Sequence, residues 1–374
     1  MTAAITPIVM PKWGLEMREG TILDWLVDEG ARIEVGTPIV DVETDKISNA
    51  VEAPDPGLLR RRIAKAGETL PVKALLGVLA EADVGDADID AFVAAYVVPE
   101  SGDDEEEGAA FDFVEVDGIR VRYARRGPAE GVPLLFIHGF GGDLGNWLFN
   151  LDALAERHPV IALDLPAHGQ SDVRLPGHSI PALAEFVVSF MQAIGADRAH
   201  LVGHSMGGAI AARMALDAPE RVASLALIAS AGLGDEINAG YIEGFAKSPS
   251  RRELKPVLEQ LFADPTLVTR QMVDDVLKYK RLDGVELLLA QLGDALFGGG
   301  RQAALPGREL ASTGKPVLVL WGRDDRIIPA AHAANAPPGA TVRVFDGAGH
   351  MAMMEKANDV NALLRAHVEA STGS

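Results

Sequence analysis

The sequence predicts two domains of different class: an all-β sandwich over residues 1–82 and a mainly parallel α/β domain with a helical cap over residues 113–374. Three observations support this organisation. The first 82 residues contain an internal repeat, the next 30 are strongly acidic, and strand-like segments alternate with helical segments from residue 113 onward. At 374 residues the chain is also long for a single domain.

The repeat consists of short apolar segments bounded by glycines. Residues 20–30 align with residues 57–67, and residues 39–42 align with residues 76–79, at the same offset of 37. Short apolar segments interrupted by glycine at regular spacing are typical of β-strands. Two similar half-sheets would pack face to face, each burying the apolar surface of the other. The repeat therefore predicts a β-sandwich.

Lys46 lies between the two repeats, in the run Glu43-Thr44-Asp45-Lys46. Residues 38–43 and 47–53 are predicted strands, so the turn that joins them would hold the Lys46 amine at an exposed tip. Together with Met10-Pro11-Lys12 and Gly57, this pattern resembles that of lipoyl domains. The resemblance implies that lipoate is attached to Lys46. The alternative is a solvated turn lysine; related biotin carriers usually flank theirs with methionines, which are missing here.

Residues 83–112 are predicted to form a flexible linker between the domains. They contain eleven acidic residues and no Lys or Arg, in a chain whose net charge is −20. Residues 89–97 suit a short helix that Pro99 would end, and the acidic run that follows should stay solvated. Nucleic acid is excluded as a partner because phosphate binding relies on clustered basic residues.

Composition and the N-terminal residues indicate where the protein is expected in the cell and which kinds of site it lacks. The chain has no cysteine, which excludes disulfides and thiolate metal sites, and no metal site is predicted. Residues 1–13 lack the features of a signal peptide. No apolar stretch reaches the roughly 20 residues that a membrane span needs. We therefore expect a cytoplasmic protein that has no membrane partner.

Six continuous apolar runs in the second domain predict strands buried on both faces of a parallel sheet. They are residues 134–137, 160–163, 200–202, 225–229, 317–321 and 342–345. Helix-like segments fall between most of them, including one at residues 208–217.

Gly203-His204-Ser205-Met206-Gly207 joins a predicted strand to a predicted helix. Glycines permit the tight turn that lifts a serine hydroxyl into a cleft, so Ser205 is the candidate nucleophile. The helix N-terminus offers the Met206 amide to a developing oxyanion, and the Phe140 amide, in His138-Gly139-Phe140-Gly141-Gly142, is the second candidate donor. A chance turn is the alternative interpretation.

Two further motifs supply the partners that a serine nucleophile needs. Asp325, after Trp321-Gly322, is the candidate acid, with Asp324 as the alternative, and His350 is the candidate base. The order of Ser205, Asp325 and His350 resembles that of the α/β-hydrolase family, over roughly residues 113–370. His138, His168 and His204 are expected to shape turns around the cleft.

Residues 232–314 look helical and resemble the cap of that family. They hold ten basic residues against twelve acidic ones, so the cap is nearly neutral in a strongly acidic chain. A solvated amphipathic surface is the first interpretation. The alternative is binding of an anionic acyl acceptor such as coenzyme A, for which Arg251, Arg252 and Lys255 form the tightest cluster.

A chain that joins a lipoyl-like domain to an α/β-hydrolase-like domain resembles the dihydrolipoamide acetyltransferase components of bacterial acetoin dehydrogenase complexes. The resemblance implies transfer of acetyl from a lipoyl arm on Lys46 to coenzyme A. It also implies two partners: a thiamine-diphosphate-dependent acetoin-cleaving component and dihydrolipoamide dehydrogenase. The His-x-x-x-Asp-Gly motif of the usual acyltransferase domain is absent, which leaves the predicted triad as the visible catalyst.

Two other functions remain open at this point. The chain is alternatively a lipoyl-linked serine hydrolase, acting on an ester or thioester with water as acceptor. Or it is a carrier subunit whose hydrolase fold is catalytically idle. The intact set of Ser205, Asp325, His350 and residues 139–142 argues against an idle fold, whereas the sequence does not distinguish water from coenzyme A.

Overall fold

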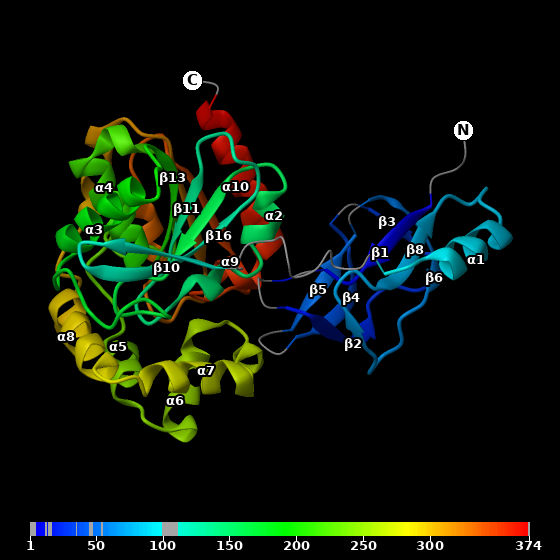
Figure 1. Ribbon diagram of the computed structural model, residues 1–374, viewed down its shortest axis with the longest axis horizontal. Helices are drawn as coiled ribbons and strands as arrows, with labels where there is room; N and C mark the ends of the chain where they lie inside the picture. The colour runs from blue at the N-terminus through cyan, green and yellow to red at the C-terminus, as the bar shows by residue number, and fades with distance from the viewer. Residues whose placement is uncertain are drawn as a thin grey trace. The chain divides into compact units, whose positions relative to one another are not determined.

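The computed structural model describes residues 5–11, 13, 17–34, 36–44, 48–53, 55–98 and 111–372. The chain divides into two compact units, residues 1–108 and residues 109–374 (Figure 1). In its described residues the first unit is all-β apart from one helix, and the second is α/β, so the predicted fold classes are confirmed. Lys46 lies outside the described residues.

The first unit is a sandwich of two antiparallel sheets, each with four strands. One sheet has the order β1-β8-β6-β3 and the other the order β5-β4-β2-β7. Apolar residues of both sheets, including Ile8, Ile22, Val42 and Leu59, are buried together in one core. The strands are β1 (Thr6–Val9), β2 (Glu19–Trp25), β3 (Arg32–Ile33), β4 (Pro38–Glu43), β5 (Ser48–Glu52), β6 (Gly57–Arg62), β7 (Thr69–Pro71) and β8 (Leu75–Ala80).

The repeat in the sequence is a repeat in the structure. β2 pairs with β4 in one sheet as β6 pairs with β8 in the other, and both pairs shift register at matching positions, just after Ile22 and just after Leu59. The Gly30 amide donates to the Leu59 carbonyl at 2.7 Å, and the Gly67 amide donates to the Ile22 carbonyl at 2.8 Å. Both glycines have positive φ, +86° and +81°, which favours glycine at these two turns. The two halves therefore close the sandwich reciprocally.

Helix α1 (Asp86–Ala95) belongs to the first unit, although it falls within the stretch expected to be linker. Ile89 is fully buried in a small apolar cluster with residues of β8. Arg60 forms an ion pair with Asp86 at 2.9 Å, and Arg61 pairs with Asp90 at 3.5 Å. Acidic residues that suggested a solvated tether are thus partners of the arginines of β6. Residues 99–110 of the expected linker lie outside the described residues.

The second unit is built on an eight-stranded sheet with the order β16-β15-β14-β13-β11-β12-β10-β9. The six strands β11 to β16 are parallel, and β9 and β10 pair antiparallel. All six predicted strands are present, although β16 lies at the sheet edge and is largely exposed. The strands are β9 (Asp112–Val116), β10 (Ile119–Arg126), β11 (Leu134–Ile137), β12 (Val160–Leu163), β13 (Ala199–His204), β14 (Val222–Ile228), β15 (Val317–Gly322) and β16 (Thr341–Phe345).

Helices connect the strands, and four of them form a cap inserted between β14 and β15, as predicted. Figure 1 shows the cap helices gathered at one end of the sheet, apart from α3 and α4. The cap helices are α5 (Ala239–Lys247), α6 (Arg251–Leu258), α7 (Arg270–Lys280) and α8 (Val285–Phe297). The others are α2 (Leu151–Ala155), α3 (Ile180–Ala193), α4 (Met206–Asp217), α9 (Ala352–Glu355) and α10 (Ala357–Thr372).

Short 3-10 segments complete the unit. They are Leu144–Trp147, Pro219–Arg221, Glu259–Leu261, Pro265–Leu267, Gly298–Gly300, Pro306–Thr313 and Ala330–Asn335. Within the described part of the chain, no helix combines the length and apolar character needed to cross a membrane.

Candidate active site

Ser205 occupies the sharp turn between β13 and α4. Its backbone has φ +53° and ψ −119°, a region that non-glycine residues adopt only when the surrounding structure holds them there. A Cβ atom at Gly207 would lie 2.1 Å from the carbonyl oxygen of Ile137, and one at Gly203 would lie 2.5 Å from the carbonyl oxygen of Gly207. The two glycines therefore let α4 begin directly against the end of β11, with Ser205 at its first turn.

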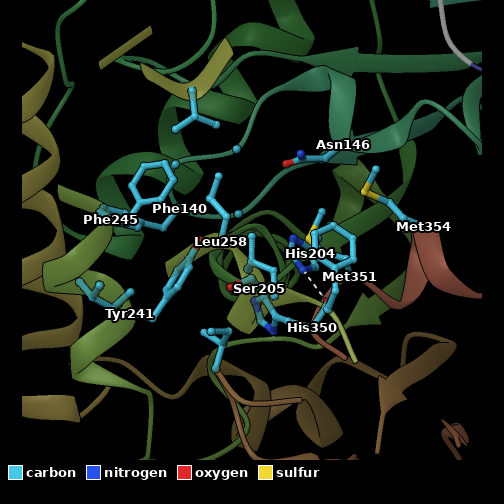
Figure 2. Close-up of a pocket in the computed structure, with 18 of the residues that line it drawn as sticks. Phe140, Asn146, His204, Ser205, Tyr241, Phe245, Leu258, His350, Met351 and Met354 are labelled. Carbon is cyan, nitrogen blue, oxygen red and sulfur yellow. Dashed lines mark hydrogen bonds between the residues drawn. The ribbon is translucent and has the colours of Figure 1, made fainter. Parts of the chain in front are cut away.

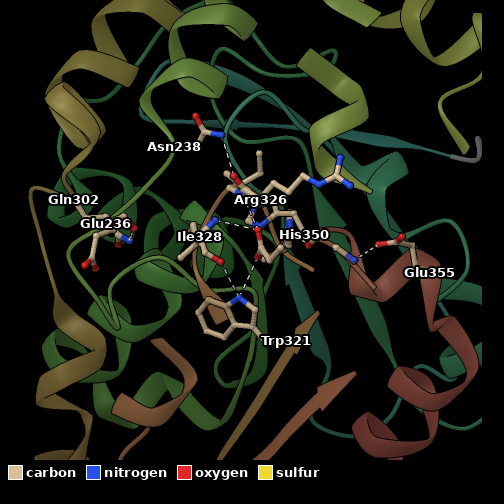
Figure 3. Close-up of polar contacts among 12 residues, drawn as sticks. Glu236, Asn238, Gln302, Trp321, Arg326, Ile328, His350 and Glu355 are labelled. Atoms are coloured by element: carbon tan, nitrogen blue, oxygen red, sulfur yellow. Dashed lines mark hydrogen bonds and ion pairs between the residues drawn. The ribbon is translucent and has the colours of Figure 1, made fainter. Parts of the chain in front are cut away.

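Asp325 and His350 meet beneath this turn. His350 Nδ1 lies 2.8 Å from Asp325 Oδ2, and the side chains are 2% and 0% exposed respectively. The other carboxylate oxygen accepts hydrogen bonds from the amides of Ile327 and Ile328, at 2.8 and 3.0 Å. The Trp321 indole donates to Oδ2 at 3.0 Å (Figure 3). The carboxylate is thus fixed on all sides, and its bond to Nδ1 holds the Nδ1–H tautomer of His350.

Asp324, the alternative acid in the sequence, is exposed. Its backbone amide donates to the Ala348 carbonyl at 2.9 Å, which helps to join the acid loop to the histidine loop. The geometry therefore assigns the carboxylate partner of His350 to Asp325.

His204 contacts the same histidine from the other side. Its Nε2 donates to the His350 carbonyl at 3.0 Å, and the two rings lie 4.7 Å apart (Figure 2). Burial, together with the charge that His350 can carry, holds the pKa of His204 well below its usual value. A neutral His204 thus supports the main chain of His350 without competing for its proton.

The loop of residues 138–142 lies directly against Ser205. A Cβ atom at Gly139 would be 2.9 Å from the Ser205 Cβ. His138 holds this loop, since its Nδ1 donates to the Gly139 carbonyl at 2.8 Å and its Nε2 accepts from the Leu165 amide at 2.9 Å. Burial lowers the pKa of His138 to about 4, so it remains neutral in this role. Phe140 lines the pocket, and Met206, as the first residue of α4, has no intrahelical acceptor for its amide.

His168 plays a similar part in a neighbouring loop. Its Nδ1 donates to the Pro166 carbonyl at 2.9 Å, and burial lowers its pKa to about 3. All three histidines that the sequence suggested as turn-shaping residues therefore bond backbone carbonyls.

The cap is tied to both catalytic loops. Asn238 lies just before α5. Its side-chain Nδ2 donates to the Arg326 carbonyl at 2.9 Å, and its backbone amide donates to the Ile327 carbonyl at 2.8 Å. Glu355 accepts from the Gly349 amide at 2.7 Å and from the Ala263 amide at 2.8 Å (Figure 3). Burial raises the pKa of Glu355, and these amide donors oppose that rise. The loops bearing Asp325 and His350 are thus held against cap segments.

The sequence did not predict these supporting contacts. Asn238 and Glu355 bind segments that are far from them in the chain. Trp321 acts through its indole, and a tryptophan in a buried strand would be expected in the core whether or not it made this hydrogen bond. The single available signal was Glu355, an acidic residue that ends the apolar run Met351-Ala352-Met353-Met354.

Ser205 and His350 lie side by side in a pocket between the sheet and the cap (Figure 2). The cap contributes apolar walls, including Tyr241, Phe245 and Leu258. The rings of Phe245 and Phe140 meet edge to face at 5.9 Å, which closes the cap onto the 138–142 loop. The free volume is about 90 Å³. It is smaller than the roughly 150 Å³ cavity that holds benzene in an engineered core. The pocket therefore suits a small acyl group.

The predicted cationic cluster is divided in the structure. Arg251 and Arg252 line a surface pocket on the cap, where Arg251 forms a two-pronged bond with Asp274. Lys255 does not line that pocket and pairs instead with Glu259, the residue just after the end of α6. Across the part of the chain that the structure describes, no group of three or more His, Asp or Glu side chains is placed to hold a metal ion.

The hairpin that bears Lys46 is described on both sides of the lysine. β4 and β5 pair antiparallel, and the last matched pair is Glu43 with Ser48. Lys46 falls in the sequence between these two paired ends, and residues 45–47 lie outside the described residues. Its place at an exposed turn therefore stays a prediction.

Two family models match the chain. The α/β-hydrolase fold matches residues 132–357, and the model for biotin-requiring enzymes, which covers biotin and lipoyl carriers, matches residues 6–79. A meta-cleavage product hydrolase from Pseudomonas fluorescens IP01 superimposes with a TM-score of 0.63 over 70% of this chain and 98% of that one. Its sequence identity is 24%, so this likeness concerns the fold alone.

Two relatives match across both domains. The dihydrolipoyllysine-residue acetyltransferase component of the acetoin cleaving system of Cupriavidus necator is 63% identical, over 98% of each chain. The protein of the same description from Pseudomonas putida is 50% identical, over 97% of this chain and 99% of its own. With both domains and nearly the full lengths matched, the chain belongs to the family of dihydrolipoyllysine-residue acetyltransferase components of acetoin cleaving systems.

Proposed function

We propose that this protein is the dihydrolipoyllysine-residue acetyltransferase of an acetoin cleaving system and passes acetyl from a lipoyl arm on Lys46 to coenzyme A through Ser205. The observation that carries the proposal is the Asp325–His350 hydrogen bond, at 2.8 Å, beside a serine in a nucleophile turn. The family resemblance along both domains supports the acyl donor and the reaction class.

Lipoate is assigned to Lys46 because this lysine falls in the sequence between the paired strands β4 and β5, within the residues matched by the carrier family model. When attached, the lipoyl group supplies a dithiol that carries acetyl as a thioester. The narrow pocket accommodates the acetyl end of such a donor, and its apolar walls match the hydrocarbon of the arm.

In the first half of the reaction, the Ser205 hydroxyl attacks the acetyl carbonyl carbon while His350 Nε2 accepts the hydroxyl proton. The bond from carbon to sulfur breaks, and His350 returns the proton to the departing sulfur. The products are acetylated Ser205 and a free thiol. Asp325 keeps the Nδ1 proton of His350 in place and stabilises the imidazolium that forms between these steps.

In the second half, the thiol of coenzyme A attacks the acetyl-serine carbonyl carbon as His350 removes its proton. The bond to the Ser205 oxygen breaks, the serine regains a proton from His350, and acetyl-coenzyme A leaves. One thioester and one thiol enter and one of each leave, so no oxidant is needed. In both halves, the amides of Phe140 and Met206 would stabilise the oxyanion at the end of the α4 dipole.

The proposed reaction requires two partner enzymes, one that loads the lipoyl arm and one that reoxidises it. A thiamine-diphosphate-dependent component that cleaves acetoin would load acetyl onto the arm, and a dihydrolipoamide dehydrogenase would reoxidise the dithiol. Membership in an acetoin cleaving system supports both assignments.

The competing acceptor is water, as in hydrolases. The pocket walls favour transfer, because most of the lining is apolar and the cap is bound to both catalytic loops. Incubation of protein bearing labelled acetyl on its lipoyl arm, with and without coenzyme A, tests this directly. We expect acetyl-coenzyme A in the first case and slow loss of label in the second. Rapid release of free acetate at the same rate in both would instead establish a hydrolase.

A further inference from the structure

A second pocket opens on the cap, between the start of α6 and the later part of α7. It is lined by cationic and polar side chains, and its volume is about 710 Å³. Its polar lining consists of Ser250, Arg251, Arg252, Asp274, Lys278 and Arg281.

This pocket has the opposite charge to the chain as a whole. Its lining contains four basic residues and one acidic residue, in a protein of net charge −20. Asp274 is held by the guanidinium of Arg251, and the Arg251 pKa is raised by that contact. Among the described residues, no carboxylate pairs with Arg252, Lys278 or Arg281 within 4 Å, so their charges face the pocket uncompensated by a direct ion pair.

The main chain adds to this attraction. Ser250 is the N-cap residue of α6, and its side chain makes no capping hydrogen bond. The first amides of a helix lack intrahelical acceptors and lie at the positive end of the helix dipole, which is why phosphate groups bind at helix N-termini. Here four basic residues surround such an end, and Arg252 stands at its second helical position.

The two pockets share helices α6 and α7. Leu258 of α6 and Met272 and Val276 of α7 line the pocket that holds Ser205. Arg251 lies seven residues before Leu258, which is about 10 Å along a helix axis. A ligand anchored at the basic pocket can therefore extend an arm along the cap toward Ser205.

We propose that this basic pocket binds the phosphate groups of coenzyme A, while the pantetheine arm carries the thiol to the acetylated serine. The inference rests on the proposed function and adds the binding site of the acceptor. It replaces the cluster suggested by the sequence: Lys255 is outside, because it pairs with Glu259, and Lys278 and Arg281 take its place. An acceptor with several negative charges needs such a site on a protein that otherwise repels it.

The test compares two acceptors that share one thiol arm. Coenzyme A carries the phosphates, and pantetheine lacks them. Arg252→Ala and Lys278→Ala remove pocket charges without breaking an ion pair. Lys255→Ala is the control, because it removes a charge of α6 that lies outside the pocket and pairs with Glu259. For each charge removed we expect the KM for coenzyme A to rise about fivefold to tenfold, since charged contacts to phosphate are strong but partly exposed here. The kcat should stay near that of the unchanged protein.

The same variants should leave the KM for pantetheine unchanged, and Lys255→Ala should leave both values unchanged. High salt should raise the KM for coenzyme A alone. Equal changes for both acceptors, or no change for either, would overturn the phosphate site. If the unchanged protein acetylates neither thiol, the proposed function fails instead, so the two failures are distinguishable.

Discussion

At the scale of single residues, Asp325 is the most constrained group of the site. Four donors converge on its carboxylate: His350 Nδ1, the Trp321 indole and the amides of Ile327 and Ile328. Three of the four would remain if the histidine moved away. The carboxylate is therefore placed by the protein in advance, and the imidazole is oriented by a fixed acceptor.

Replacement of this acid tests its role. Asp325→Asn keeps the size of the side chain but can no longer hold the Nδ1–H tautomer of His350. The corresponding change in a comparable triad lowers kcat by about 10⁴. We expect a loss of that order in acetyl transfer and in the cleavage of a simple ester. Asp324→Asn is the matched control, and should leave both rates nearly unchanged because Asp324 is exposed. The reverse pattern would assign the acid to Asp324.

The residues of the proposed triad could be found in the sequence because each belongs to a short local motif. Ser205 and Asp325 follow the buried strands β13 and β15, and His350 follows the edge strand β16, each within a few residues, so strand patterns and glycines located them. His204 was expected only to shape a turn, and the contacts that His204, Asn238 and Glu355 make could not be predicted, because they join segments that only the fold brings together. The basic pocket of the cap was predictable in part, because Arg251 and Arg252 stand together in the sequence. The ion pair that holds Lys255 away from this pocket depends on the side-chain rotamers of Lys255 and Glu259.

At the scale of elements, the helix that was expected to interrupt a flexible linker is part of the first unit. Its moderate apolar content gave little indication of packing, and the acidic residues around it suggested solvation. Arg60 and Arg61 of β6 reverse that expectation, because they bind Asp86 and Asp90 while Ile89 fills a gap beside β8. The strands, in contrast, followed their apolar runs closely.

Docking of α1 is expected to depend on Ile89. Ile89→Ala removes a fully buried side chain, which typically costs about 2–5 kcal/mol. Hydrogen exchange of the α1 amides should then accelerate by at least tenfold relative to the unchanged protein. Asp88→Ala, at an exposed position on the same helix, is the control. Equal exchange in the unchanged protein and Ile89→Ala would show that α1 is not packed.

The pair formed by β13 and β14 leads to a prediction about pH. His200 on β13 is 1% exposed and lies 2.8 Å from the Ser224 hydroxyl on β14. Burial lowers the pKa of His200 to about 4, from 6.5. Above pH 6.5 the residue is neutral whether the chain is folded or unfolded. Between pH 6.5 and 4 the unfolded chain binds the proton and the folded chain does not, so its contribution to stability falls as the pH falls.

His200→Gln isolates this contribution. In urea unfolding of the second unit, the free energy of unfolding of the unchanged protein should decline more steeply below pH 6.5 than that of the variant. The difference should be as much as about 1.4 kcal/mol per pH unit. Parallel pH profiles for the two proteins would mean that His200 takes up its proton without unfolding.

At the scale of the whole molecule, one chain combines a carrier with the catalyst that unloads it. A covalent tether turns the meeting of donor and enzyme into an intramolecular event with a high effective concentration. The carrier assignment requires one modified lysine. After expression with a lipoylating enzyme, intact-mass analysis should show a single adduct. Lys46→Ala should remove that adduct, and Lys65→Ala, at an exposed position of the same unit, should keep it. An adduct that survives Lys46→Ala would place the arm elsewhere.

The central claim is that acetyl passes through Ser205. The most direct test is the rate of acetyl-coenzyme A formation by Ser205→Ala protein with an acetylated lipoyl arm. Attack by coenzyme A directly on the donor thioester, with His350 as base, would need no serine and would keep much of the rate. The covalent route predicts loss of nearly all transfer in the variant. It also predicts that the unchanged protein, without coenzyme A, gains one acetyl group on the peptide containing Ser205. Substantial acetyl-coenzyme A formation by Ser205→Ala would contradict the account.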